Sequence, residues 1–288
     1  MNRRTTLAWA SGLLGMLAPA LSWAQPATEV FVHRATTGNT QSNRTFIQNR
    51  LTNDRPGAVV FVTPTLTPVS GAGPLSPNVV SVVFDRYRRL WAIVDQSNTP
   101  IRIGAAFNVR VSAYESVASQ GRRHRATPDN TVANFTDIDD PALNNNPYAV
   151  VIVNHSAGLP DDPLGFHNHV VGVSYNNATR KWSIFNEDYA PMPVGTSFNY
   201  IAGVGAFVHR ATPDNTGGVQ TYFDHVRTTG RPGALILATH NRSLGGVIGP
   251  QNDSPLNMRY VGTRWGIFNA RFGRNIVFGA AFNVLPLN

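Results

Sequence analysis

A four-residue block, His-Arg-Ala-Thr, occurs three times and constrains the fold of this chain more than any other feature. It begins at His33, His124 and His209. Three further blocks follow each copy in the same order: Pro-x-Ala with an apolar run, Trp-x-Ile, and Gly-x-x-Phe-Asn. Self-similarity at a fixed period is the signature of a repeat architecture. The chain therefore contains three tandem copies of one module of roughly 80 to 90 residues.

Each copy has the sequence pattern of an all-β module. Short β-branched and aromatic runs alternate with clusters of Gly, Pro, Asn and Asp, which is typical of strands joined by turns. Residues 58–62 and 150–153 are apolar on both faces and are expected to be central strands between two packed layers. We predict three β-sandwich or barrel-like modules over residues 28–111, 120–202 and 203–288. The linker over 112–121 is long, whereas that over 201–206 is short and apolar, so modules 2 and 3 should pack as a rigid pair.

Residues 1–24 have the pattern of a secretory signal peptide. Arg3 and Arg4 form a basic start, residues 7–21 are mainly apolar, and Ser22-Trp23-Ala24 offers small residues for cleavage. Gly and Pro interrupt the apolar run, which is too short for a spanning helix. We expect a secreted or periplasmic protein with no transmembrane segment in the mature chain.

Composition removes several classes of function. Cysteine is absent, which excludes disulfides and thiolate metal sites. The net charge is +8 and the basic residues are almost all Arg, but no Lys/Arg run is present. The absence of such runs and the expected export both argue against a nucleic-acid partner, so we expect no nucleic acid to bind.

The repeated motifs resemble a family of exported bacterial repeat proteins of unknown function. That family carries the signatures HRAT, DHPLTNG, NPNA, NDHPIGVWY, RWAIFNQD and MPVGAAFNV. Module 2 matches over residues 167–175 and 186–195, and module 3 over 222–225. Module 1 has Gln48-Asn49-Arg50 and Ser76-Pro77-Asn78 at the two Asp-His positions, so it departs from the pattern. The resemblance covers the mature chain and implies an architecture, but no reaction.

Two repeated features are expected to be structural. The His-Arg-Ala-Thr block leads into turn residues such as Thr127-Pro128-Asp129-Asn130, so its His and Arg are expected to hydrogen-bond loop carbonyls and fix the turn. Trp91, Trp182 and Trp265 share a strand face with Ile two residues on and are expected in the core. The tyrosines are better candidates for an exposed sugar platform; they are Tyr175, Tyr189, Tyr222 and Tyr260.

Module 2 differs from its neighbours in charge. Residues 120–202 hold eight Asp/Glu and five Arg/Lys, a net charge of 5 − 8 = −3. Oxygen-rich loops suit Ca²⁺, whereas His at i and i+2 with a carboxylate suits Zn²⁺ or Cu²⁺. A divalent cation (Ca²⁺ or Zn²⁺) in module 2 is therefore a hypothesis, with solvated acidic loops as the alternative. Its ligands would be Asp161, Asp162, His167 and His169.

No catalytic motif is present: G-x-S-x-G, H-E-x-x-H, a phosphate loop and a dinucleotide fingerprint are all missing from the sequence. No acid pair is repeated with the modules, which favours a non-enzymatic protein. We expect a binding or surface-interaction protein for a glycan or cell-surface polymer, with its three faces acting together. The expected ligand-binding residues are Tyr175, Glu187, Asp188, Tyr189, Asp224 and His225.

Two alternatives stay open. One is a polysaccharide hydrolase that uses Glu187 or Asp188 with Asp161 or Asp162 as its two carboxylates. The other is a structural matrix or envelope protein, to which Asn- and Gly-rich β repeats would also be suited.

Overall fold

The structure, a computed structural model, describes residues 28–67, 71–114, 121–158, 162, 166–203 and 205–287. The expected signal peptide lies outside these residues. The described residues form strands and turns with no helix, so none is present there that could span a membrane. The all-β prediction is confirmed.

The strands repeat in the same order in each module. Those of module 1 are β1 (Thr28–Arg34), β2 (Thr40–Gln41), β3 (Arg44–Ile47), β4 (Val59–Thr65), β5 (Val80–Asp85), β6 (Leu90–Asp95) and β7 (Ala106–Ser112). Those of module 2 are β8 (Gly121–Arg125), β9 (Thr131–Val132), β10 (Phe135–Ile138), β11 (Val151–Ala157), β12 (Val171–Asn176), β13 (Lys181–Asn186) and β14 (Ser197–Ala202). Those of module 3 are β15 (Phe207–Arg210), β16 (Thr216–Gly217), β17 (Gln220–Phe223), β18 (Ile236–Asn241), β19 (Ser243–Leu244), β20 (Val247–Ile248), β21 (Leu256–Val261), β22 (Arg264–Asn269) and β23 (Ala281–Pro286).

Each module is a sandwich of two half-sheets. The inner half has three strands, β1-β7-β4 in module 1, and the outer half has four, β2-β3-β6-β5. The two halves enclose a core with a central tryptophan, Trp91, Trp182 or Trp265, whose indole N–H donates to a backbone carbonyl at 2.9 Å in every module. The predicted core position of these tryptophans is confirmed. β4 and β11 are buried along their whole length, as expected of central strands.

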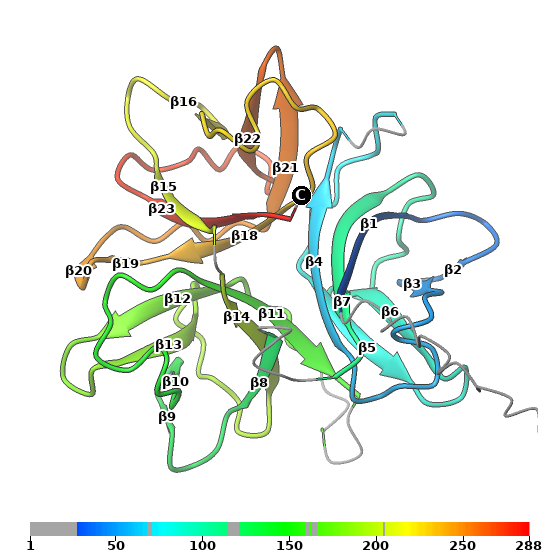
Figure 1. Cartoon of the computed structure of the whole chain (residues 1–288), viewed down its shortest axis with the longest axis horizontal. Coiled ribbons are helices and arrows are strands. Elements are labelled where there is room, and N and C mark those ends of the chain that lie inside the picture. Colours follow the sequence, from blue (N-terminus) through cyan, green and yellow to red (C-terminus); the bar gives the residue numbers. More distant parts are fainter. Residues whose placement is uncertain are drawn as a thin grey trace, which may run out of the picture.

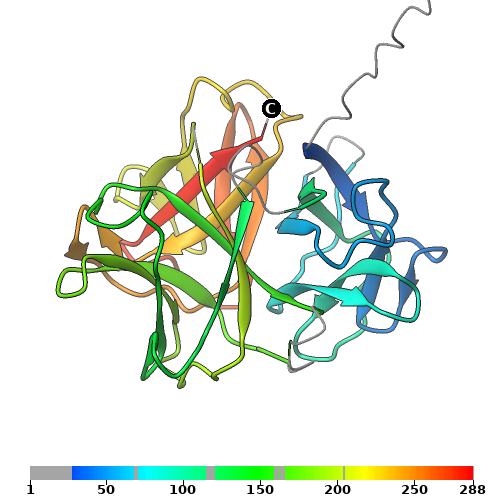
Figure 2. The ribbon, with the colours of Figure 1, turned by 60° about the horizontal axis from the view of Figure 1, so that its bottom comes forward.

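The modules share their sheets in a closed ring (Figure 1). Each of the three seven-stranded sheets joins the outer half of one module to the inner half of another through a parallel strand pair. The pairs are β5 with β11, β12 with β18, and β21 with β4. Figure 2 shows the blue and cyan strands of module 1 grouped on one side of the green-to-red strands of the others. All three of these joints between modules are alike in this respect. Modules 2 and 3 pack together through a shared sheet, and module 1 is joined to each of them in the same way.

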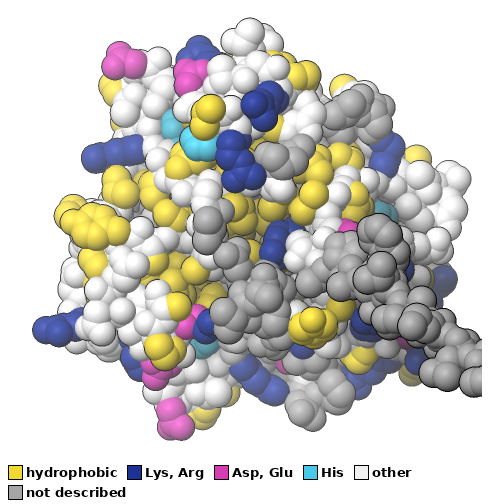
Figure 3. Space-filling view, in the orientation of Figure 1, with side chains coloured by type: hydrophobic (Ala, Val, Ile, Leu, Met, Phe, Trp, Pro, Cys, Tyr) yellow, Lys and Arg dark blue, Asp and Glu magenta, His cyan; other side chains and the backbone are white. Residues whose placement is uncertain are grey.

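The inner halves meet along a pseudo-threefold axis. Phe61, Ile152 and Leu237 occupy equivalent positions on the three inner strands and form one buried cluster with Val59, Ile201 and Leu285. Hydrophobic side chains also gather around the centre of the face on which the C-terminus lies (Figure 3). Residues from all three modules bury this cluster, so the centre of the ring is a hydrophobic core that the three modules share.

Three asparagines of the Gly-x-x-Phe-Asn blocks close the ring. The side-chain amide of Asn108 donates to the carbonyl of Ile236, that of Asn199 to Val60, and that of Asn283 to Val151, at 3.0, 2.8 and 2.8 Å. Each of these bonds runs from one module to another, and all three amides are buried. Because a buried carbonyl without a donor is costly, this repeated residue fixes the register between modules.

The His-Arg-Ala-Thr block fixes a turn, as expected, but its histidine acts differently. His33 Nε2 lies 2.7 Å from Thr45 Oγ1, and His124 and His209 pair with Thr136 and Thr221 at the same distance. The predicted bond from His to a loop carbonyl is therefore wrong, because the ring reaches a hydroxyl on the neighbouring strand. Arg34 does donate to the loop carbonyls of Gly71 and Gly104.

Candidate functional site

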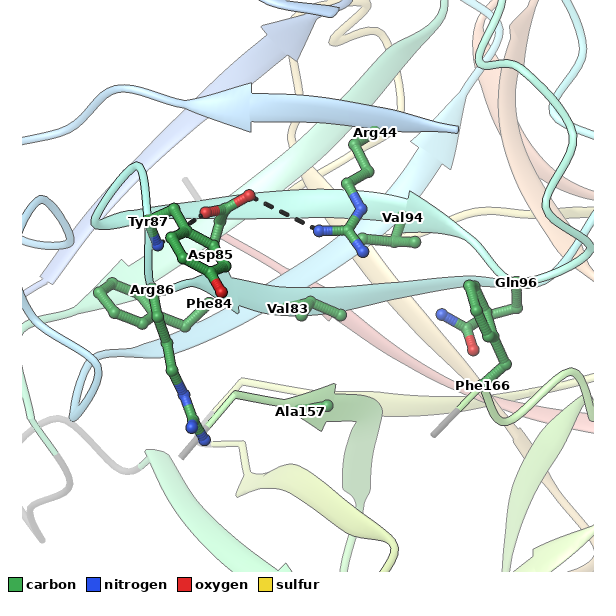
Figure 4. A pocket seen from close by; sticks show the side chains of 10 residues that line it. All are labelled: Arg44, Val83, Phe84, Asp85, Arg86, Tyr87, Val94, Gln96, Ala157 and Phe166. Atoms are coloured by element: carbon green, nitrogen blue, oxygen red, sulfur yellow. Dashed lines mark hydrogen bonds and ion pairs between the residues drawn. The ribbon is translucent and has the colours of Figure 1, made fainter. Parts of the chain in front are cut away.

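The outer half of module 1 carries an open cavity of about 510 Å³ (Figure 4). Val83, Phe84 and Val94 give it an apolar floor, while charged and aromatic groups stand at its edges. The full described lining is Arg44, Val83, Phe84, Asp85, Arg86, Tyr87, Val94, Gln96, Ala157 and Phe166. An apolar floor with a few polar groups is the usual composition of a ligand site.

One end of the cavity is shaped by Asp85, the last residue of β5. Its Oδ1 accepts the backbone N–H groups of Tyr87 and Arg88 at 3.0 and 2.9 Å, which is the hydrogen-bonding pattern of an Asx turn. Its Oδ2 lies 3.6 Å from the Arg44 guanidinium. The turn presents Tyr87 to solvent with 101% exposure, so an aromatic face stands beside an Arg–Asp pair.

The other end of the cavity lies at the joint with module 2. Figure 4 shows Gln96 and Phe166 there, opposite Asp85 and Tyr87. Gln96 accepts the backbone N–H of His167 at 2.7 Å and donates its own amide to Ser81. Phe166 is 55% exposed. The cavity thus runs between two exposed aromatic rings, one at each end.

The equivalent outer face of module 2, over its described residues, has different side chains and a cover. Ser174 and Asn176 stand where module 1 has Val83 and Asp85. The β19–β20 hairpin of module 3 lies against this face: Ser243 Oγ is 2.8 Å from Ser174 Oγ, and the Arg242 guanidinium lies 5.8 Å from the centre of the Phe185 ring.

Glu187, predicted as a ligand residue, is buried at the joint between modules 2 and 3 with 2% exposure. It occupies the position that Gln96 has in module 1 and likewise accepts an N–H from the next module, that of Asn252 at 3.3 Å. The ring of His240 lies 3.7 Å from its other oxygen. Burial raises the pKa of Glu187 to about 8, so the carboxyl is a neutral packing group at pH 7.

Asp188 and Tyr189 follow Glu187 and do reach the surface. His169 Nδ1 lies 2.7 Å from Asp188 Oδ2. Burial raises the pKa of Asp188, but hydrogen bonds from His169 and the Ala190 N–H outweigh it and the net shift is downward. Tyr189 is 62% exposed, as expected, with Arg242 over its ring at 5.9 Å.

The remaining predicted ligand residues do not join this group. Tyr175 is buried against Trp182, so its expected exposure is wrong: the strand face it occupies is the one that packs on the module core. Asp224 forms an ion pair with Arg264 on module 3, and His225 stacks on Phe207 at 4.3 Å. Tyr222 and Tyr260 are half-buried.

The predicted metal ligands are only partly assembled. His167 and His169 lie together, with ring centres 5.1 Å apart. His167 Nε2 is 2.8 Å from Asn186 Oδ1, whereas Asp162 accepts the hydroxyl of Ser197 at 2.5 Å. Asp161 lies outside the described residues. Within the described part of the chain, no group of three or more His, Asp or Glu side chains could hold a metal ion.

Sequence reasoning missed the cavity of module 1. The signal was present in the comparison between modules: Val83 of β5 and Val94 of β6 share one face of the sheet, where module 2 has Ser174 and Phe185. The turn over 85–89, Asp-Arg-Tyr-Arg-Arg, also combines an aromatic residue with basic ones at an exposed tip.

Comparison with known proteins agrees with the repeat. A family described as a domain of unknown function (DUF7452) matches residues 20–111, 81–202 and 200–286. No match was found among curated proteins or among solved structures. The three matches together span most of the sequence, and the chain belongs to this family of unknown function.

Proposed function

We propose that this protein is an exported, non-enzymatic binding protein for a glycan or cell-surface polymer, and that the polymer lies in the open cavity of module 1. The observation that carries the proposal is the fully exposed ring of Tyr87 beside the Arg44–Asp85 pair, above an apolar floor. A sugar ring has an apolar face and a rim of hydroxyls. An aromatic ring can cover the first while a guanidinium and a carboxylate bond the second.

The shape of the cavity suits a chain rather than an isolated ring. Tyr87 and Phe166 stand at opposite ends, and the floor between them is formed by Val83 and Val94 (Figure 4). A polymer could cover both aromatic rings and continue into solvent at either end. The secretory pattern of residues 1–24 supports export to the secreted or periplasmic space, where such polymers occur.

The carboxylates offered for a hydrolase do not support that alternative. Glu187 is 2% exposed and engaged with Asn252 at a joint between modules. Asp188 is held by His169 at 2.7 Å. A glycosidase needs two carboxyl groups that both reach the bond to be cleaved, and Glu187 does not reach solvent.

The proposal is tested by retention of the mature protein on a panel of immobilised polysaccharides. We expect retention on at least one anionic or neutral polysaccharide, and a loss of about tenfold in affinity for Asp85→Ala, which removes both the turn and the partner of Arg44. Asn176→Ala is the matched control from module 2, because Asn176 occupies the position of Asp85 and accepts the backbone N–H groups of Ala178 and Thr179 in the equivalent turn. This variant should bind as the parent does. Absence of retention on every polymer, or equal losses for the two variants, would overturn the proposal.

A further inference from the structure

Module 3 presents exposed apolar side chains on two segments of its surface. One segment is the β19–β20 hairpin, and the other is the loop over 270–279 between β22 and β23. The ring of Phe272 is entirely open to solvent, with 106% exposure. We call the exposed apolar residues of the two segments the apolar tips; they are Leu244, Val247, Ile248, Phe272, Val277 and Phe278. An exposed apolar patch of this kind marks an interaction site.

The two segments lie side by side. The hairpin leads into Pro250, whose ring packs beside Gly279 at one end of the loop. At the other end, the N–H of Arg271 donates to Ser254 Oγ at 3.0 Å, and its guanidinium pairs with Asp253. Hydrophobic side chains gather at the edge of the molecule where Figure 1 labels β20 (Figure 3). The apolar tips therefore belong to one region of the surface.

The charge around the apolar tips is positive. Arg274 is exposed within the loop, and the guanidinium of Arg210 lies beside Gly279. Residues 203–288 contain eight Arg and three Asp, a net charge of 8 − 3 = +5. Two of the three Asp side chains form ion pairs with arginines, Asp224 with Arg264 and Asp253 with Arg271. A surface with this balance attracts an anionic partner.

The apolar tips distinguish module 3 from the other two modules. The equivalent loops, over 95–104 in module 1 and 186–195 in module 2, contain no phenylalanine. The loop of module 2 also carries Asp188 at its surface, and that module has a net charge of −3. An apolar and basic surface is thus a property of module 3 and not a consequence of the repeated fold.

The shape of this region favours a lipid surface over a protein groove. The exposed residues stand on a hairpin and a loop, and Phe272 projects without neighbours around its ring. A bilayer adapts its shape to such projections. At a membrane interface, apolar side chains enter the acyl region while cations stay among anionic headgroups. Aromatic and aliphatic tips beside Arg274 and Arg210 provide both kinds of contact.

We infer that module 3 docks on an anionic phospholipid bilayer through the apolar tips. This contact goes beyond the polymer binding proposed above. None of the six residues lines the open cavity of module 1, so docking would leave that cavity available. A chain that holds a polymer on module 1 and a bilayer on module 3 would connect the two.

The test is co-sedimentation of the mature chain with two kinds of vesicle, one of phosphatidylglycerol with phosphatidylethanolamine and one of phosphatidylcholine alone. We expect binding to the anionic vesicles and about tenfold weaker binding to phosphatidylcholine. Phe272→Ser should weaken binding to the anionic vesicles by about tenfold, as expected when one large apolar side chain leaves the bilayer. Val132→Ser is the matched control, because Val132 is an exposed apolar residue of module 2, and it should bind as the parent does.

A second measurement reports insertion directly. Phe272→Trp keeps an aromatic side chain and adds a fluorophore, whereas Trp91, Trp182 and Trp265 are buried in the module cores. Vesicles with brominated acyl chains should quench the added emission of Phe272→Trp. The corresponding control, Val132→Trp, should show no more quenching than the parent.

Three results would overturn the inference: no binding of the parent to anionic vesicles, equal losses for Phe272→Ser and Val132→Ser, or no quenching of Phe272→Trp. Gel filtration without vesicles tests the alternative occupant, a second copy of the chain. A dimeric parent and a monomeric Phe272→Ser variant would assign the apolar tips to an interface between copies and would also overturn it. Phe272→Ser should keep polysaccharide retention, so failure of this inference and failure of the polymer proposal give different results.

Discussion

The joint between modules 1 and 2 and the joint between modules 2 and 3 have the same backbone and different consequences. In the first, the amide of Gln96 accepts an N–H from module 2, and the outer face beside it is open. In the second, the carboxyl of Glu187 takes the same role, and Arg242 with the β19–β20 hairpin covers the face. Repetition of a fold therefore does not repeat its surface, and a carboxylate that suggests chemistry can be a structural contact.

The largest expected effect is a loss of stability at acid pH. The two joints differ here, because they hold different numbers of buried histidines. His155 and His167 belong to the first joint and His240 to the second, and burial lowers the pKa of all three, to about 3, 4 and 4. His33, His124 and His209, with pKa values lowered by burial to about 4, act in the same direction. Their stabilisation is complete above pH 6.5 and is lost as the pH falls toward 4, at up to about 1.4 kcal/mol per pH unit for each ring.

We therefore expect the free energy of unfolding to fall by on the order of 10 kcal/mol between pH 6.5 and 4.5 through these six rings. Urea unfolding across this range would measure the loss. Replacing His155 and His167 together by Gln should reduce the proton uptake on unfolding by about two, and replacing His240 alone by about one. Unchanged uptake in these variants would show that the rings are not buried as described.

The second prediction concerns Glu187 and Gln96, which occupy equivalent positions at the two joints and can be exchanged. Glu187 is protonated in both states below about pH 4.5, ionises only in the unfolded chain between 4.5 and 8, and ionises in both states above 8. Stability should therefore decline by about 2 kcal/mol from pH 6.5 to 8 through this group. Glu187→Gln should remove that decline, and Gln96→Glu should introduce a similar one in the first joint.

The measurement is the urea midpoint of each variant at the two pH values. The parent chain serves as the control for Glu187→Gln, and the double exchange should restore the decline of the parent. A Gln96→Glu variant without added pH dependence would contradict the equivalence of the two positions.

The third prediction concerns the buried asparagines that bond one module to another at each joint. Asn199→Ala removes the bond to Val60, and Asn283→Ala removes the bond to Val151. Each leaves a buried carbonyl without a donor, so each should cost about 1–3 kcal/mol. Since each sheet crosses a joint, we expect tryptophan fluorescence and circular dichroism to report one coincident unfolding transition in both variants. Separate transitions would indicate that the modules fold independently.

The smallest expected effect concerns the cover over module 2. Arg242→Ala removes the guanidinium that lies over Phe185 and Tyr189. The loss should be about 0.5–1 kcal/mol, as for a partly exposed cation–π contact. Polymer retention should not change, because the face beneath carries Ser174 and Ser183 where the open face of module 1 has Val83 and Ala92. Thermal unfolding and the polysaccharide panel would check both statements.

The sequence was sufficient to predict the repeat, the all-β class and the tryptophan cores, because these follow from spacing within one module. It could not show that the sheets cross between modules. That arrangement depends on contacts such as Asn199 with Val60, which are far apart in the chain. The same limit explains the errors about Tyr175 and Glu187: residue type identifies a polar or aromatic group, but only packing decides which face another strand covers.

The central claim, that the open face of module 1 binds the polymer, is tested most directly by a matched pair of tyrosines. Tyr87 and Tyr189 are both exposed, at 101% and 62%, and stand on modules 1 and 2 respectively. Affinity for the retained polysaccharide should be measured for Tyr87→Ala and Tyr189→Ala, with both folds checked by circular dichroism. We predict a loss of about tenfold or more for Tyr87→Ala, as for a base stacked on an aromatic ring, and less than about twofold for Tyr189→Ala. Equal losses, or a larger loss for Tyr189→Ala, would contradict the account.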